Sequence, residues 1–261
     1  MDKVDVLKLL KEKQRRIEEN RINQYKPYDY QKKFHTGGAE CPQRILMAAN
    51  RVGKTFCGAA ETSYHMSGIY PEWWTGHKFD HPVRVWAAGE SNDTTRDIIQ
   101  RELFGNPQDP SKLGQGAIPK DLIVSTVRKP GVPNAFSSAL VKHITGGNSS
   151  ISFKAYEQGF EKFMGEAVDV VWLDEEPKQE IFSQCITRTA DTRGIVYMTF
   201  TPEKGMTQVV SGFLNELKPG QALVTATWDD VDHLDADTKE QLLAVYSPAE
   251  RDMRSRGIPV F

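Results

Sequence analysis

The segment from Arg44 to Met66, RILMAANRVGKTFCGAAETSYHM, most strongly limits what this chain can fold into. An apolar run comes first, a loop containing Gly53 follows, and a helix-compatible stretch begins at Lys54. A strand, a glycine-containing loop and a helix in this order predict a phosphate-binding loop, because the loop N–H groups and the helix N-terminus can surround phosphate oxygens. In such a loop Lys54 reaches the β- and γ-phosphates, and the Thr55 hydroxyl binds Mg²⁺.

The first position of this kind of loop is usually glycine, and here it is Ala48. A small side chain suffices at the end of a strand if the residue does not need a positive φ, so alanine weakens the match without excluding it. Taken alone, the motif is also compatible with an ordinary turn between a strand and a helix. The loop residues predicted to contact the nucleotide are Ala48, Ala49, Asn50, Arg51, Val52, Gly53, Lys54 and Thr55.

A second apolar run, in AVDVVWLDEE, ends in acidic residues and decides between these interpretations. An aspartate at the end of a strand, Asp174, can hold Mg²⁺ in an enzyme with a phosphate-binding loop. Its neighbour Glu175 can orient and deprotonate an attacking water molecule. The alternative is a strand followed by a charged turn, and Glu176, which precedes Pro177, is given no catalytic role. Adjacent Asp and Glu favour ATP hydrolysis by an additional-strand ATPase, and the chain has no N-K-x-D signature for guanine.

The stretch MTFTP adds two threonines on one face of a further strand. Thr199 and Thr201 alternate along it, and Thr201 lies at its end, where a hydroxyl can sense the γ-phosphate. Threonine is common in strands, so this stretch carries little weight by itself.

Apolar runs alternate with helix-compatible stretches from residue 44 onward, which predicts parallel strands joined by crossover helices. We therefore expect an α/β fold of the additional-strand, recombinase-like class, with a central, mostly parallel sheet flanked by helices and a small helical lid. The expected parts are an N-terminal helical segment at 1–24, an ATPase core at 25–215 and a lid or linker subdomain at 216–261. The Pro- and Gly-rich stretch 106–149 is expected to be an insertion or irregular connection containing two short strands.

The composition is that of an ordinary soluble globular protein, with 39% hydrophobic and 26% charged residues among 261. No apolar stretch is long enough to span a bilayer, and the charged N-terminus lacks the features of a signal peptide, so we expect no membrane contact. The net charge of −2 gives no overall electrostatic argument for a nucleic-acid partner.

Four stretches taken together, PYDYQ, AANRVGKT, VVWLDEEP and RTADTRGIVYMTFTP, resemble the large terminase subunit of tailed bacteriophages, in particular the headful-packaging type of short-tailed phages. The resemblance extends from about Tyr25 to the C-terminus, and its specificity comes from the ordered set of motifs. It implies a motor that uses ATP and Mg²⁺ to drive double-stranded DNA into a procapsid.

The resemblance also implies roles for individual residues. Gln31 matches the glutamine that reads adenine, and Tyr28 lies near the base. Arg51 matches an arginine often found inside the terminase loop, where it can stabilise charge on the transferred phosphoryl group. Thr199 to Thr201 match the motif that couples hydrolysis to movement. Lys54 and Thr55 match the lysine and the hydroxyl residue of the family's loop. Asp174 matches the magnesium aspartate, and Glu175 matches the catalytic glutamate.

The partners that the resemblance implies are a portal protein, a small terminase subunit and further copies of the chain in a ring on the portal. The expected location is the cytoplasm of an infected bacterial cell and not the mature virion. The family normally continues past a segment like RSRGIPVF into a metal-dependent nuclease domain, whereas this chain stops at Phe261. We therefore expect an ATP hydrolase without nuclease activity.

Two alternatives and one assignment remain open from the sequence. A helicase-like ATPase shares these motifs, but the chain has no Q-x-x-G-R-x-x-R-like sequence. A nucleotide-dependent DNA- or protein-interaction module that does not hydrolyse ATP would not need Glu175 beside Asp174. The arginine finger is Arg51 within its own loop or one of three others that spacing does not rank, namely Arg96, Arg101 and Arg188.

Overall fold

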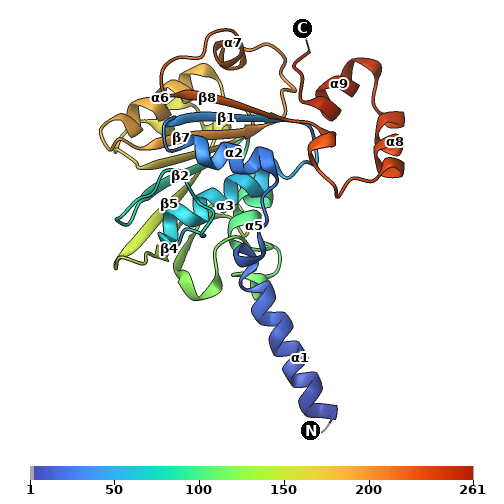
Figure 1. Cartoon of the computed structure of the whole chain (residues 1–261). Helices are drawn as coiled ribbons and strands as arrows, with labels where there is room; N and C mark the ends of the chain where they lie inside the picture. The colour runs from blue at the N-terminus through green and yellow to red at the C-terminus, as the bar shows by residue number, and fades with distance from the viewer. Residues whose placement is uncertain (1–2, 261) are drawn as a thin grey trace.

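The computed structural model describes residues 3–260 and builds them around one 8-stranded sheet (Figure 1). The order of the strands across the sheet is β3-β4-β5-β2-β6-β7-β1-β8. Their bounds are β1 Gln43–Ala48, β2 Arg84–Gly89, β3 Ile123–Arg128, β4 Phe136–Lys142, β5 Asn148–Ala155, β6 Val170–Asp174, β7 Ile195–Phe200 and β8 Gln221–Ala226.

The strands from β5 to β8 in this order run parallel to one another, whereas β4 and β3 continue the sheet in antiparallel pairing. This confirms the expected mostly parallel sheet. β7 lies between β1 and β6, which is the inserted strand that defines the additional-strand arrangement. Both antiparallel strands come from the stretch 106–149, so part of this predicted irregular connection extends the sheet.

Helices and short helical turns connect the strands. The α-helical segments are α1 Lys3–Glu18, α2 Asp29–Gly37, α3 Lys54–Ser67, α4 Asn92–Thr94, α5 Arg101–Phe104, α6 Gln179–Ala190, α7 Gln208–Asn215, α8 Ala236–Val245 and α9 Pro248–Arg256. The 3₁₀ turns are η1 Arg21–Gln24, η3 Pro110–Lys112, η4 Lys120–Leu122, η5 Tyr156–Gln158, η6 Phe160–Phe163 and η7 Trp228–Asp230. A π-helical turn, η2 Thr95–Gln100, joins α4 to α5.

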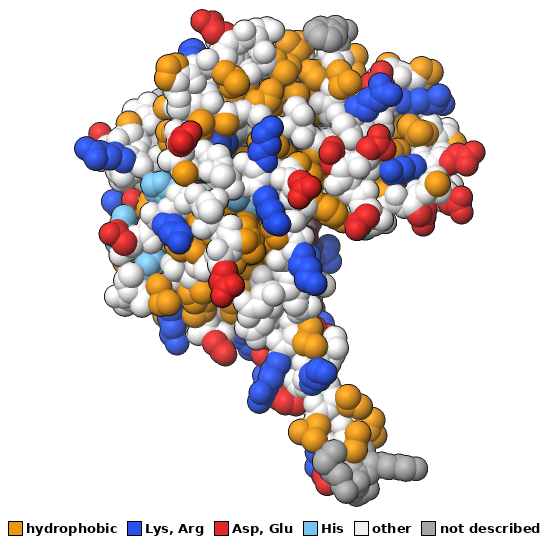
Figure 2. All heavy atoms as spheres, in the orientation of Figure 1, with side chains coloured by type: hydrophobic (Ala, Val, Ile, Leu, Met, Phe, Trp, Pro, Cys, Tyr) orange, Lys and Arg blue, Asp and Glu red, His pale blue; other side chains and the backbone are white. Residues whose placement is uncertain are grey.

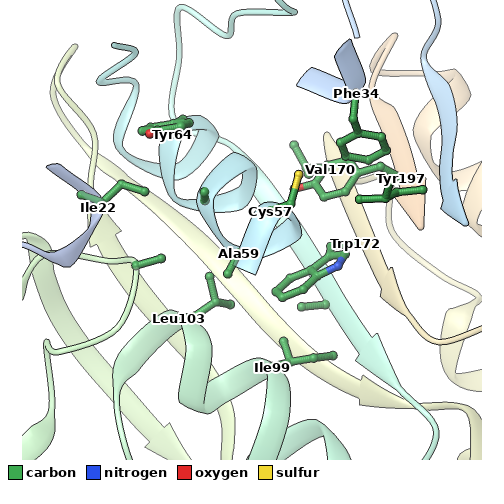
Figure 3. Packing of buried hydrophobic residues seen from close by; sticks show 14 of the residues in the cluster. Ile22, Phe34, Cys57, Ala59, Tyr64, Ile99, Leu103, Val170, Trp172 and Tyr197 are labelled. Atoms are coloured by element: carbon green, nitrogen blue, oxygen red, sulfur yellow. The ribbon is translucent and has the colours of Figure 1, made fainter. Parts of the chain in front are cut away.

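The sheet is covered on both faces, so its central strands are buried on both sides. Helices α2, α3 and α5 pack on one face, and α6 and α7 pack on the other (Figure 1). Side chains alternate along β1 accordingly, with Leu46 in the core under α3 and Met47 in the core under α6. Figure 3 shows the first of these cores, where Cys57 of α3 lies among the aromatic rings of Phe34, Trp172 and Tyr197.

Helix α3 lies close to the strand β6 because Gly58 has no side chain at the contact. A Cβ atom at this position would lie 2.4 Å from Trp172 Nε1, which is shorter than any real contact. The close approach brings the beginning of α3 near the end of β6, where the acidic pair is located.

A fully buried charged cluster ties α2, β1 and α3 together. Arg44 on β1 forms an ion pair with Glu61 on α3, and its Nη1 also donates to the Phe34 carbonyl at 2.5 Å. His35 Nδ1 lies 2.6 Å from Glu61 Oε2, and His65 Nε2 lies 3.3 Å from Glu61 Oε1. Burial by itself would raise the pKa of Glu61, but Arg44 and the two histidines hold this pKa well below its usual value. The cluster therefore fixes the helices on either side of the loop.

The N-terminal helix α1 extends away from the body of the molecule (Figure 1) and leaves Leu7 57% exposed. No helix within the described range is both long and apolar enough to cross a membrane. On the face drawn in Figure 2, basic and acidic side chains are interspersed, in keeping with the small net charge.

The C-terminal region contains both sheet and helix. Strand β8, within the expected lid at 216–261, pairs with β1 in the main sheet. Helices α8 and α9 lie outside the sheet, beside the carboxyl ends of the strands (Figure 1). Both helices begin with a capping contact, because the Asp235 side chain accepts from the Thr238 N–H at 2.7 Å and the Glu250 side chain accepts from the Ser247 N–H at 3.1 Å. We refer to residues 228–260 as the lid segment.

Candidate active site

The carboxyl ends of β1, β7 and β6 meet at one edge of the sheet, and the candidate residues lie there. β7 pairs in parallel with both neighbours, which places Met47 opposite Phe200 and Asp174 opposite Thr199. Ligands of open α/β sheets bind at this edge. The tertiary structure therefore brings together the phosphate-binding loop, the acidic pair and the two threonines that the sequence singled out.

The loop between β1 and α3 needs glycine at its end and not at its beginning. Gly53 has φ 89°, in the left-handed region that favours glycine. Ala48 is not among the described residues with a positive φ, so alanine meets the condition that the sequence analysis set for it. Arg51 has φ 63°, which is uncommon for a residue other than glycine and is typical of functional loops.

Side chains on both sides of the loop bind its backbone carbonyls. The Thr201 hydroxyl lies 2.9 Å from the Ala48 carbonyl oxygen and 2.7 Å from Asn50 Oδ1. From the lid segment, Trp228 Nε1 donates to the Asn50 carbonyl at 2.8 Å, and the Arg254 carbonyl accepts from the Asn50 N–H at 2.8 Å. The core and the lid segment therefore hold the same loop residue.

Helix α2 binds the second half of the loop. The Tyr30 hydroxyl donates to the Val52 carbonyl, and Gln31 Nε2 donates to the Gly53 carbonyl at 3.0 Å. Within residues 3–260, no protein acceptor binds the backbone N–H groups of residues 51–56. Free N–H groups at the start of a helix form an anion-binding arrangement, so this loop can hold phosphate oxygens.

Lys54 and Thr55 begin α3 beside the acidic pair. Lys54 is buried, and among the described residues no carboxylate forms an ion pair with it. Burial raises the pKa of both Asp174 and Glu175, and the positive charge of Lys54 opposes the rise in each. Thr55 follows Lys54 at the start of α3, and its side chain also opposes the rise in the pKa of Asp174. These four residues are the ones that the sequence predicted to surround the phosphates and the metal.

Asp174 ends β6 and is held in one orientation by the neighbouring strand. The Thr199 hydroxyl donates to Asp174 Oδ1 at 2.8 Å and accepts from Trp172 Nε1 at 2.9 Å. Burial raises the pKa of Asp174 to about 6, although the Thr199 hydrogen bond and the Lys54 charge oppose this rise. Thr199 therefore donates a hydrogen bond to the aspartate, whereas Thr201 contacts the loop.

Glu175 has a left-handed backbone, with φ 64°, and its N–H donates to the Thr199 carbonyl at 2.9 Å. Burial, followed by the nearby charge of Asp174, raises its pKa to about 7. A carboxylate with a pKa near neutrality is matched to accepting a proton from water. Glu176 is engaged elsewhere, because its side chain accepts from Thr207 and its carbonyl accepts from Lys204 Nζ at 2.8 Å.

Magnesium would have few protein ligands at this edge. Within the described range, no three His, Cys, Asp or Glu side chains gather in a way that could enclose a metal ion. Thr55 and Asp174 supply hydroxyl and carboxylate oxygens, which suit a small hard cation that keeps several waters and binds substrate phosphates. The donor set therefore fits Mg²⁺ held together with a nucleotide.

The two residues predicted at the base-binding position lie next to the loop and contact the protein itself. The Gln31 side chain accepts from the Tyr28 N–H at 2.9 Å, in addition to its contact with the loop. The Tyr28 hydroxyl lies 2.8 Å from Asp232 Oδ1 and 2.9 Å from His233 Nδ1, and His233 Nε2 donates to the Arg51 carbonyl at 2.8 Å. The lid segment therefore reaches Tyr28 and the loop through one histidine.

The four candidate arginines differ in their surroundings. Arg51 is exposed on the loop itself. Arg96 is bound by Asp93 at 2.9 Å and Asp97 at 2.8 Å. Arg101 is exposed on α5. Arg188 lies in the last turn of α6, and its carbonyl accepts at 3.0 Å from the N–H of Val168, two residues before β6 begins. This places Arg188 at the amino edge of the sheet, away from Asp174.

Sequence reasoning did not single out Trp172, Trp228 or His233, although all three bind the site. Each acts by donating one hydrogen bond from a ring nitrogen to a group distant in the sequence. The only available signal for the lid residues is an aromatic and a histidine following a strand in ATWDDVDH, which is too common to interpret alone.

Comparison with known proteins gives consistent relatives. Residues 45–260 match the family model described as terminase large subunit, T4likevirus-type, N-terminal. The terminase large subunit of Salmonella phage P22 is 36% identical over 275 residues, covering 99% of this chain and 55% of that protein. The terminase large subunit of Enterobacteria phage LP7 is 23% identical, covering 99% of this chain and 57% of that protein. The chain thus spans little more than half the length of these curated relatives.

Solved structures share the fold. The large terminase ATPase domain of Thermus phage P74-26 aligns with a TM-score of 0.62 and 15% identity, covering 92% of this chain and 96% of that one. The large terminase of a thermophilic bacteriophage, solved in complex with ADP, aligns with a TM-score of 0.61 and 15% identity over 89% of this chain and 52% of that one. At this identity the likeness confirms the α/β fold class.

Proposed function

This chain belongs to the family of phage terminase large subunits, and from this membership we propose that it is an ATP-hydrolysing motor domain that packages double-stranded DNA into a procapsid. The observation that carries the proposal is the position of Glu175, which lies beside Asp174 and Lys54 at the edge where the phosphate-binding loop ends. A domain that only bound nucleotide would not need a carboxylate with a pKa near neutrality at this place.

Hydrolysis follows from the roles of these residues. The loop N–H groups and Lys54 would bind the phosphates, and Thr55 and Asp174 would hold Mg²⁺, which would supply charge neutralisation at the phosphates. Glu175 accepts a proton from water as the water oxygen attacks the γ-phosphorus. The bond from that phosphorus to the bridging oxygen breaks, so ADP and inorganic phosphate leave. Arg51 stabilises the charge on the transferred group.

Coupling to movement is assigned to Thr199 and Thr201. Thr199 contacts the magnesium aspartate and Thr201 contacts the loop, so the end of β7 touches both halves of the site. The same loop is bound by Trp228 and His233 of the lid segment, through which a change at the phosphates would reach the lid.

Adenine selectivity is assigned to Gln31 with Tyr28, whose positions beside the loop support the assignment. The Gln31 amide can both donate to and accept from the adenine edge. We expect Gln31→Ala to raise the KM for ATP more than it lowers kcat. Equal turnover of ATP and GTP by the wild-type chain would count against this role.

The partners proposed are double-stranded DNA, the portal protein, the small terminase subunit and further copies of the chain in a ring. The location proposed is the cytoplasm of the infected bacterium and not the mature virion. The family names of the relatives support these assignments, and the electrostatics of the chain neither require nor oppose them.

Phosphate release with and without double-stranded DNA tests the proposal. Lys54→Ala should abolish both nucleotide binding and turnover, because the β/γ-phosphate contact is lost. Lys33→Ala, an exposed lysine on α2, is the matched control and should behave like the wild type. Nucleotide binding without any turnover would instead identify a non-hydrolysing interaction module, and near wild-type hydrolysis by Lys54→Ala would refute the loop assignment.

A further inference from the structure

The Tyr156 hydroxyl lies at the back of the catalytic edge. Tyr156 begins η5, directly after β5, and is buried against Phe163 with ring centroids 6.4 Å apart. Its hydroxyl oxygen is 2.8 Å from the Glu175 carbonyl, 3.1 Å from the Asp174 carbonyl and 3.2 Å from the Ala88 carbonyl. A phenol has one proton, so it donates to one of these carbonyls at a time, and the shortest distance is to Glu175.

Glu175 needs external support because its backbone conformation is unfavourable. A left-handed conformation at a residue other than glycine is unfavourable and persists only where neighbouring groups enforce it. The Glu175 N–H is held by the Thr199 carbonyl, and the Glu175 carbonyl is held by Tyr156. The N–H and the carbonyl of Glu175 are therefore both hydrogen-bonded, the N–H to β7 and the carbonyl to Tyr156 of η5.

The conformation matters for the direction of the side chain. Successive side chains of an extended strand point to opposite faces. The turn at Glu175, where φ is 64°, ends this alternation while its N–H stays bonded to the Thr199 carbonyl at the carboxyl end of β7. Tyr156 remains a donor throughout, because burial holds the pKa of its phenol well above the usual value.

We propose that Tyr156 is a positioning residue, whose O–H···O=C bond to Glu175 holds the catalytic carboxylate toward the γ-phosphate. This inference rests on the role of Glu175 in the proposed function. Tyr156 contacts no reacting atom, so its effect is exerted on kcat and not on the affinity for nucleotide.

Tyr156→Phe removes one oxygen atom and keeps the ring. We expect kcat in single-turnover hydrolysis to fall by ~10- to 100-fold, as for other residues that orient a catalytic group. The Kd of a non-hydrolysable ATP analogue should stay within about twofold, since the loop is untouched. In the Glu175→Gln background the same change should lower kcat no further, because the two residues act as a unit. Tyr156→4-aminophenylalanine keeps a donor and should restore most of the rate.

Tyr197→Phe is the matched control. The Tyr197 hydroxyl is also buried, but it lies 2.5 Å from Thr62 Oγ1 of α3 and forms no hydrogen bond to Asp174 or Glu175 within the described residues. Tyr197→Phe should lower the melting temperature, but it should not lower kcat while leaving the Kd unchanged.

A wild-type kcat in Tyr156→Phe, or a parallel loss of kcat and affinity, would overturn the positioning role. Further slowing on top of Glu175→Gln, or no rescue by the amino variant, would also do so. If Glu175→Gln itself hydrolyses ATP at the wild-type rate, the proposed function of Glu175 fails and this inference fails with it. If Glu175→Gln hydrolyses ATP slowly and Tyr156→Phe hydrolyses it at the wild-type rate, the positioning role is wrong but the proposed function of Glu175 stands.

Discussion

Burial raises the pKa of Asp174, the last residue of β6, and of Glu175, which follows it. Asp174 is bound by Thr199 and lies beside Thr55, so its oxygens are oriented for a metal ion. Glu175 has the higher pKa, about 7, and a backbone turned away from the strand direction. This difference supports the proposal that Asp174 holds the cation and Glu175 accepts the proton.

Substitution of each acid should therefore have a different effect. Glu175→Gln keeps size and polarity but removes the base, so kcat should fall by ~10²- to 10⁴-fold while ATP affinity is largely kept. Asp174→Asn should mainly weaken Mg²⁺-dependent nucleotide binding. Turnover and equilibrium binding measured on both variants check this, with Glu176→Gln as the control because Glu176 is bound to Thr207. The reverse pattern would exchange the two roles.

The raised pKa of Glu175 also predicts how the stability of the nucleotide-free chain depends on pH. Between the ordinary value of 4.5 and about 7, the folded protein binds more protons at this site than the unfolded chain does. The stability contributed by this group is therefore present below pH ~4.5 and is lost as pH rises through ~7. We expect the free energy of unfolding of the wild-type chain to decrease between these two pH values. In Glu175→Gln the decrease should be smaller by about 1–3 kcal/mol, as measured by denaturant unfolding. Identical pH dependence in the two proteins would contradict the buried position of this carboxylate.

At the scale of elements, the phosphate-binding loop is held between the sheet and the lid segment. Thr201 at the end of β7 binds the loop from the sheet, and Trp228 and His233 bind it from η7 and the turn that follows. A loop fixed by its carbonyls keeps its N–H groups oriented before the nucleotide arrives. Any shift of the lid segment must break or move these bonds.

Trp228→Phe tests this link, because it removes the N–H donor to the Asn50 carbonyl and keeps an aromatic ring. Leaving a buried carbonyl unpaired costs about 1–3 kcal/mol, so ATP binding should weaken by roughly 5- to 100-fold. Trp74→Phe is the matched control, since it removes a similar bond from Nε1 to the His77 carbonyl, 2.9 Å long, outside the site. Isothermal titration of both variants with a non-hydrolysable analogue makes the comparison. Equal affinities in the two variants would show that the lid segment does not order the loop.

At the scale of the whole molecule, the site lies at one edge of the sheet and carries the exposed Arg51, for which no ion pair is formed within residues 3–260. Ring ATPases commonly complete such a site with an arginine from the next subunit, which contributes about 10³- to 10⁵-fold in rate. Of the other candidates, Arg188 lies at the amino edge and Arg96 is bound by two aspartates. Arg101 is thus the more accessible candidate for a contribution in trans.

The chain in dilute solution should therefore be a slow ATPase whose turnover per molecule rises with protein concentration. Turnover and mass in solution measured over the same concentration series check this expectation. Arg101→Ala should remove the rise, whereas Arg51→Ala should lower the rate at every concentration. Fast turnover by a proven monomer, independent of concentration, would place the finger in cis at Arg51.

The sequence predicts the fold class, which the structure confirms, and it names site residues that stay predictions. Short, continuous apolar runs predicted the strands, because a strand that is buried on both faces has apolar side chains on both. Gly53, Lys54 and Thr55 could be recognised because a phosphate-binding loop is a contiguous motif whose chemistry depends on neighbouring residues. Asp174 and Glu175 could be recognised for the same reason.

Only the tertiary structure decided which distant groups support these residues. Trp228 and Asn50 are 178 positions apart, and His233 and Arg51 are 182 apart, so no local pattern relates them. The left-handed backbone of Glu175 is likewise invisible in its sequence, since that conformation is imposed by Thr199 and by the Tyr156 hydroxyl from other strands. Adjacent residues that act together can be recognised in the sequence, whereas the orientation of their side chains depends on hydrogen bonds that form only when the sheet is assembled.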